Sequence, residues 1–277
     1  MTNIKIVTDS TTDLPKEIID ELKITVVPLT IHIDDQTFVD GVDLSPEDFL
    51  PMMAKAEQLP KTSQPSIGEF INKYEELAAD GSQILSIHMT SGMSGTYRAA
   101  SMAAEQANAD VKVIDSTYIA SALGFQVVEA AKLAKEGKPL QQIVARIEEI
   151  RNNSKLFVVV STLENLLKGG RIGRGKAWIG SLLKLKLIAA LEDGVYTPVT
   201  KARTQAQVVQ TLLSHFNKDT EGKKVKGVSI SHANGLELAH KLRDKLKEHS
   251  VSIQTTTPVI STHTGEGAIG FTYYTES

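Results

Sequence analysis

The chain has 277 residues, of which 41% are hydrophobic and 23% are charged, as is typical of a soluble globular protein. This length suits two domains or one large α/β domain, and the net charge of -3 gives no reason to expect a nucleic acid as partner. The absence of cysteine excludes disulfides, thiol catalysis and cysteine-ligated zinc or iron–sulfur centres.

The N-terminal segment begins with a short apolar run at residues 4–7, which predicts the first strand. This run is too short for a secretory signal, and no later segment approaches the length of a membrane span. We therefore expect a soluble, cytoplasmic protein without membrane insertion. A hydroxyl-rich turn follows at residues 8–13, and Pro15 favours a helix start for which Asp13 is the expected cap.

The first half of the sequence alternates between apolar runs and helical patterns. Strands are expected at residues 24–33 (with a break at Pro28), 37–39, 83–89 and 111–114, and helices from Pro46, after Ser66, from Tyr97, at 118–135 and at 140–151. Residues 59–66 are expected to be irregular because they contain two prolines and three hydroxyls. Strands that alternate with helices predict a parallel, doubly wound sheet in this half.

The second half has a different pattern. Strands are expected at residues 156–160, 187–191, 195–201, 225–231, 251–256 and 268–274, with a short helix around Leu166 and an amphipathic helix at 236–246. Asp193-Gly194 is a strong hairpin signal. We therefore predict an α/β N-terminal domain at residues 1–154 and an α+β C-terminal domain at residues 155–277, the latter with a mixed or antiparallel sheet.

The most informative stretch is residues 83–98, where a buried strand leads through a turn of hydroxyls and glycines into a helix. This geometry directs backbone amides at an anion, so we interpret the turn as holding the polar head of a small ligand. Two alternatives stay open. Ser94 could be a helix cap without a ligand, or a hydrolase nucleophile with His263, although Thr96 stands where the elbow motif needs its second glycine.

A basic, glycine-rich segment follows the short helix of the second half. Its basic residues are Lys168, Arg171, Arg174 and Lys176, with Lys184 and Lys186 soon after. The segment nearly matches a P-loop, but Ala177 lacks the magnesium-binding hydroxyl and a helix precedes it, so nucleotide binding is rejected. It is either a solvated basic face or a docking surface for an acidic or phosphate-bearing partner.

His263 lies in a run of small residues at 261–268 that we expect to be a loop. It is either an ordinary loop histidine or an accessible donor to an anion. The seven histidines show no metal-ligand spacing, so no metal site is expected. Asp9 and Asp13 are explained as a strand-end residue and a cap, and an anionic ligand would be repelled by them.

Five blocks of the sequence together resemble the DegV family, the bacterial fatty-acid-binding proteins that serve as binding subunits of fatty acid kinase. The blocks are Thr8-Asp9-Ser10-Thr11-Thr12-Asp13-Leu14, Thr62-Ser63-Gln64-Pro65-Ser66, Ser91-Gly92-Met93-Ser94-Gly95-Thr96-Tyr97, Gly169-Gly170-Arg171-Ile172 and His263-Thr264-Gly265-Glu266-Gly267-Ala268. The resemblance implies a two-domain fold with a long-chain fatty acid between the domains. It also implies that Thr62, Ser94, His263 and the Gly95 amide hold the carboxylate, and that Arg171 lies where the kinase subunit docks.

The resemblance further implies that a separate ATP-using kinase phosphorylates the bound acid to an acyl phosphate for phospholipid synthesis. The protein itself is then a non-catalytic lipid carrier without a cofactor, with the fatty acid as its ligand. Physical chemistry agrees, because a buried carboxylate needs several donors and each buried methylene contributes about 0.8 kcal/mol. The alternative is a serine hydrolase or esterase that uses Ser94 and His263.

Overall fold

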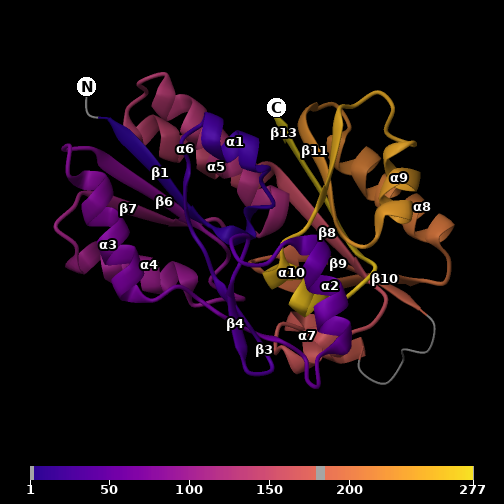
Figure 1. Cartoon of the computed structure of the whole chain (residues 1–277). Coiled ribbons are helices and arrows are strands. Elements are labelled where there is room, and N and C mark those ends of the chain that lie inside the picture. Colours follow the sequence, from indigo (N-terminus) through magenta and orange to yellow (C-terminus); the bar gives the residue numbers. More distant parts are fainter. Residues whose placement is uncertain (1–2, 179–184, 277) are drawn as a thin grey trace.

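The computed structural model describes residues 3–178 and 185–276 of the chain. Figure 1 shows two groups of elements, one built from the N-terminal part and one from the C-terminal part, each around its own sheet. None of the helices in these two ranges has the length and hydropathy needed to cross a membrane. Of the predicted basic cluster, Lys184 lies outside the described residues.

The N-terminal part is organised around a four-stranded parallel sheet with the strand order β2-β1-β6-β7. Its strands are β1 (Ile4–Asp9), β2 (Thr25–Val27), β6 (Gln83–His88) and β7 (Val111–Asp115), and its helices are α1 (Lys16–Glu21), α3 (Ile67–Ala78), α4 (Thr96–Gln106), α5 (Ala120–Lys135) and α6 (Leu140–Asn153). Helices α3 and α4 pack on the sheet face that carries Val7 and Ile84, and α5 and α6 pack on the opposite face. The predicted parallel, doubly wound sheet is confirmed.

The C-terminal part contains a six-stranded mixed sheet with the strand order β10-β9-β8-β13-β11-β12. Its strands are β8 (Ser154–Val160), β9 (Lys186–Glu192), β10 (Val195–Ala202), β11 (Lys224–Ala233), β12 (Val251–Thr255) and β13 (Ala268–Glu276). Only the β11–β12 pair is parallel, so the predicted mixed sheet is confirmed. Helices α8 (Gln205–Thr220) and α9 (Leu236–Arg243) cover its outer face, and α5 contacts its inner face (Figure 1).

Several turns and helix starts that the sequence predicts are found in the structure. Pro28 separates β2 from β3 (Thr30–Ile33), and Ser45 caps α2 (Pro46–Lys55). The Asp193-Gly194 pair forms the hairpin between β9 and β10, with both residues at positive φ. Helix α6 ends where β8 begins, which is where the domain boundary at residue 154 was placed; that boundary stays a prediction.

The prediction that residues 59–66 are irregular holds for residues 59–60 and 64–66 and is wrong for residues 61–63. Residues 61–63 form β5 (Lys61–Ser63), which pairs with β3, and β4 (Gln36–Val39) completes a small antiparallel sheet. The two prolines lie on either side of β5, so they limit its length without removing a hydrogen bond from it. This strand presents Thr62 to the C-terminal part of the chain.

The prediction that Asp13 caps the first helix is also wrong. Helix α1 begins after Pro15 without a side-chain cap. The Asp13 carboxylate instead accepts hydrogen bonds from the Thr256 hydroxyl at 2.9 Å and the Thr257 amide at 3.1 Å. Burial raises the pKa of Asp13 to about 6, and these donors oppose that rise. Asp13 therefore joins the first turn of the chain to a segment more than two hundred residues later.

The loop predicted at residues 261–268 is helical at residues 261–264, including His263, and only residues 265–267 are a loop. Residues 258–264 form α10 (Pro258–Thr264), with Pro258 in its first turn, and His263 lies in its last turn. Helix α10 contacts α2, α7 (Glu164–Lys168), β3 and β5. The small residues that suggested a loop allow this short helix to be buried between the two parts of the chain.

Candidate ligand-binding cavity

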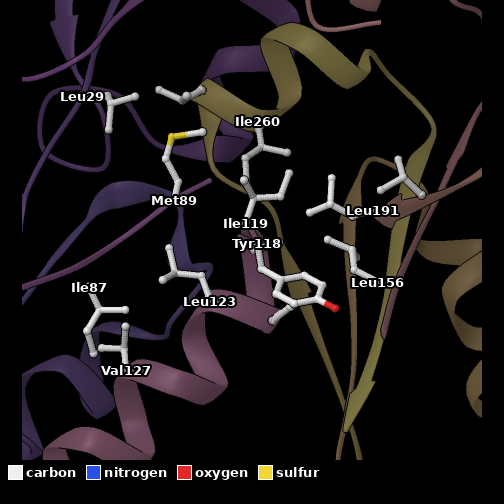
Figure 2. Packing of buried hydrophobic residues seen from close by; sticks show 14 of the residues in the cluster. Leu29, Ile87, Met89, Tyr118, Ile119, Leu123, Val127, Leu156, Leu191 and Ile260 are labelled. Atoms are coloured by element: carbon white, nitrogen blue, oxygen red, sulfur yellow. The ribbon is translucent and has the colours of Figure 1, made fainter. Parts of the chain in front are cut away.

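A cavity of about 300 Å³ lies where the two parts of the chain meet. Its wall is formed by Thr11, Leu29, Thr62, Ser63, Gln64, Met89, Met93, Ser94, Gly95 and Ile119 from the N-terminal part and by Arg171, Tyr196, Val259, Ile260 and His263 from the C-terminal part. Figure 2 shows Met89, Ile119 and Ile260 at this junction. Two smaller hollows of about 20 Å³ each share Tyr196 with the cavity.

All five residues singled out from the sequence line this cavity: Thr62, Ser94, Gly95, Arg171 and His263. They come from β5, the turn before α4, the segment after α7 and the end of α10. The fold thus brings together segments that are far apart in the sequence. That these residues bind a ligand remains a prediction.

Thr62 and His263 are joined directly, since Thr62 Oγ1 lies 2.9 Å from His263 Nε2. The other ring nitrogen, Nδ1, is buried and has no hydrogen-bond partner among the described residues. A Cβ atom at position 169 would collide with this ring, so Gly169 allows the close approach. The imidazole is therefore packed tightly, with its Nε2 directed at β5.

Burial, and to a smaller extent the nearby charge of Arg171, lower the pKa of His263 from its ordinary value to about 4. The ring is therefore neutral at neutral pH. A neutral imidazole can donate one hydrogen bond and accept another, which suits a site shared with hydroxyl groups.

We expect the His263→Gln variant to lose less thermal stability on acidification than the wild type, both measured without ligand. The ordinary pKa of histidine is 6.5, so the unfolded wild-type chain binds more protons than the folded one between pH 6.5 and about 4. Neutral His263 thus stabilises the fold above pH 6.5, and this contribution is lost as pH falls to about 4. Calorimetric Tm values across this range test the prediction, and parallel curves for the two proteins would contradict it.

The Ser94 hydroxyl is engaged by the helix that follows it. Ser94 Oγ lies 2.8 Å from Thr96 Oγ1 and accepts a hydrogen bond from the Thr96 amide at 3.2 Å. Among the described residues, no hydrogen bond joins Ser94 to His263, and no acid orients the His263 ring. The relay that a serine hydrolase requires is therefore not formed by these two residues in this structure.

Arg171 lies at the cavity wall and joins both parts of the chain. Its Nε donates to the Met93 carbonyl at 3.0 Å, and its Nη1 donates to the Gly169 carbonyl at 2.7 Å. The side chain is half-buried, so it presents a positive charge to the cavity as well as to the surface. The sequence suggested only a docking role and gave no signal that this cation also faces the cavity.

A buried hydrogen-bond chain behind the cavity was not predicted. Tyr74 donates to Ser86 at 2.8 Å, Ser86 Oγ lies 2.7 Å from His88 Nε2, and His88 Nδ1 lies 3.1 Å from Asp9 Oδ2. This order resembles a catalytic triad, but all four side chains are fully buried, so a substrate has no access to Ser86. This buried hydrogen-bond network therefore has a structural role behind the cavity.

Asp9 connects that network to the cavity wall. Its carboxylate accepts hydrogen bonds from the amides of Thr11 at 3.0 Å and Met89 at 2.8 Å, both of which line the cavity. Burial alone would raise the pKa of Asp9, but the hydrogen bonds from His88, Thr11 and Met89 hold it below its ordinary value. Asp9 is therefore more than the strand-end residue expected from the sequence.

Metal binding has no support in the described parts of the chain, where no group of three or more His, Asp or Glu side chains could hold an ion. The protein is therefore an α/β protein with a cavity between its two parts. The part with the parallel sheet and the part with the mixed sheet both contribute residues to the cavity wall, which has polar and apolar side chains.

Comparison with known proteins then gives the family. The family model "Uncharacterised protein, DegV family" matches residues 3–276, and a DegV domain-containing protein of Staphylococcus aureus (strain N315) is 44% identical over 274 residues, 98% of each chain. The solved structure of a fatty-acid-binding DegV family protein from Thermus thermophilus has a TM-score of 0.94 at 30% identity, covering 99% of this chain and 100% of that one. DegV, a fatty acid binding protein from Bacillus subtilis, has a TM-score of 0.90 at 33% identity over 100% of both chains. The chain belongs to the DegV family, and the resemblance noted in the sequence is confirmed.

Proposed function

We propose that this protein binds one long-chain fatty acid in the cavity and presents its carboxylate to a separate fatty acid kinase subunit, which converts it to an acyl phosphate for phospholipid synthesis. The observation that supports this most strongly is the convergence of Thr62, Ser94, His263 and Arg171 on one cavity that also has apolar walls. Related DegV proteins from Thermus thermophilus and Bacillus subtilis bind fatty acids. The protein acts in the cytoplasm as a carrier, without a cofactor of its own.

The head of the ligand is held by donors of two kinds. The hydroxyls of Thr62 and Ser94, the His263 ring and the Gly95 amide supply uncharged donors, and Arg171 supplies a charge. A carboxylate buried in protein is stable only when such donors replace its water shell. Donors on several sides leave one carboxylate oxygen free to attack a phosphoryl group that the kinase delivers.

The tail of the ligand is held by apolar surface contributed by both proposed domains, residues 1–154 and 155–277. Leu29, Met89, Ile119, Val259 and Ile260 line the cavity, and the hollow that Tyr196 shares with Val158 and Leu166 extends this apolar surface. Because each buried methylene contributes about 0.8 kcal/mol, the tail provides most of the affinity and the head provides the orientation.

The proposal is tested first by what the purified protein contains and binds. Lipid extraction and native mass spectrometry are expected to recover a long-chain fatty acid, and the lipid-free protein is expected to bind added palmitate or oleate. The Thr62→Val and Ser94→Ala variants are expected to bind palmitate about 10- to 100-fold more weakly, since each loses one hydrogen bond to a charged group. A wild-type protein that contains and binds no fatty acid would exclude the proposal.

The carrier role is tested with the kinase of the same organism and ATP. Acyl phosphate, trapped with hydroxylamine as the hydroxamate, is expected only when both proteins are present. A fluorophosphonate probe separates this role from hydrolysis: it is expected to leave Ser94 unlabelled. Covalent labelling of Ser94, with release of acid from acyl esters by this protein alone, would replace the carrier proposal with the hydrolase alternative.

A further inference from the structure

The turn between β7 and α5 combines two unusual backbone conformations. Thr117 has a φ of 58° and Ala120 has a φ of 54°, both in the left-handed region that L residues rarely adopt. For a β-branched residue such as Thr117 this conformation is a true outlier. The two strained positions enclose Tyr118 and Ile119, so any relaxation of the turn would move these two side chains.

Hydrogen bonds from three directions hold the turn in this strained form. The Thr117 amide donates to Asp115 Oδ1 at 2.8 Å, and the Thr90 amide donates to the Tyr118 carbonyl at 2.9 Å. The Tyr118 hydroxyl donates to the Ser154 carbonyl at 2.7 Å. Strained residues persist only where their surroundings fix them in this way, and they gather at sites that hold ligands.

Ile119 lies in this turn, and its side chain forms part of the wall of the ligand cavity. It lines the cavity together with Met89 and Ile260, and Figure 2 shows these three side chains near one another. Ile119 also lines a second hollow, together with Ala120. Only 4% of Ile119 is exposed. Its side chain is thus a partition between the cavity and that hollow, and its position sets the width of the cavity.

We propose that Thr117 is a positioning residue and Ile119 a specificity-determining residue: the strained turn holds Ile119 as a fixed partition against the alkyl chain of the bound acid. This inference rests on the proposed binding of a fatty acid. A wall that is already ordered needs no ordering when the ligand binds, so it favours affinity. Loosening the turn lowers affinity chiefly by speeding dissociation.

Thr117→Gly tests the inference, because glycine adopts a positive φ without strain. The matched control is Lys23→Gly, where an exposed residue with a φ of 53° lies away from the cavity. In both variants the Tm is expected to stay unchanged or to rise by up to about 4 °C. Palmitate is expected to bind Thr117→Gly about fivefold or more weakly, with faster dissociation, and to bind Lys23→Gly as it binds the wild type.

In Thr117→Gly the palmitate affinity is therefore expected to fall while the Tm does not. A residue with a purely structural role would lose both together. An unchanged palmitate affinity in Thr117→Gly would overturn the inference, and so would a loss of affinity accompanied by a lower Tm. Ile119→Val, which removes one methyl group from the partition, is expected to release palmitate at least about twofold faster; an unchanged rate would also overturn it. A wild-type protein that binds no palmitate would instead overturn the proposed function, and this inference with it.

Discussion

Octanoate is expected to bind this protein roughly ten-thousand-fold more weakly than palmitate. Palmitate has eight more methylene groups, and at about 0.8 kcal/mol for each buried group the difference is about 6 kcal/mol. The apolar wall around Ile119 and Ile260, with the hollow that Tyr196 shares with Val158 and Leu166, is the surface that would bury them. Titration of the lipid-free protein with both acids measures the ratio.

The two acids serve as controls for each other because they share one head group. Their difference in affinity therefore reports only on the tail. Affinities within tenfold of each other would mean that most of the longer chain stays in water, and would exclude this cavity as the acyl site. Intermediate chain lengths should give a steady increase in affinity until the space is filled.

Arg171→Gln is expected to weaken palmitate binding about 10- to 100-fold. A hydrogen bond to a charged group is worth about 1.5–3 kcal/mol, and Arg171 is the cation that lines the cavity. Glutamine keeps a polar side chain of moderate length but removes the charge and the hydrogen bonds to the Met93 and Gly169 carbonyls, so the Tm of the variant is measured beside its affinity. Calorimetric titration with palmitate measures the effect, and acyl phosphate formation with the kinase is measured on the same samples.

Arg174→Gln is the matched control for this experiment. Arg174 lies three residues further on, is half exposed, and pairs with Asp193 at 3.0 Å on the surface. Its replacement is expected to leave palmitate affinity unchanged. If Arg171→Gln also keeps its affinity but fails to support acyl phosphate formation, Arg171 serves kinase docking alone, and its proposed contact with the carboxylate is wrong.

The elements that the sequence predicts well are those specified by local signals. The alternation of apolar runs and helical patterns predicts the parallel sheet, and Asp193-Gly194 predicts the β9–β10 hairpin of the C-terminal sheet, because each depends on neighbouring residues. Strand β5 was missed because its pairing partner, β3, supplies the hydrogen bonds, and no local pattern marks it. Helix α8 was not predicted either, although Thr204 and Gln207 form a capping box at its start.

The site was predictable only in part, for a similar reason. The resemblance to a family singled out Thr62, Ser94, Gly95, Arg171 and His263, and the structure brings all five to one cavity. Their contacts, however, join positions up to 201 residues apart, which no local pattern specifies. The same holds for the Asp9–His88 pair behind the wall and for Asp13, whose partners come from the far end of the chain.

The place of β13 in its sheet has a consequence for biosynthesis. Among the strands that the structure describes, β13 comes latest in the sequence, yet it lies between β8 and β11, so the C-terminal sheet stays in two unconnected pieces until β13 has been synthesised. The parallel sheet of the first half has all its strands by residue 115 and can form while the ribosome is still working. The wall of the cavity also includes Val259, Ile260 and His263 from α10, so the cavity is completed long after the parallel sheet has all its strands.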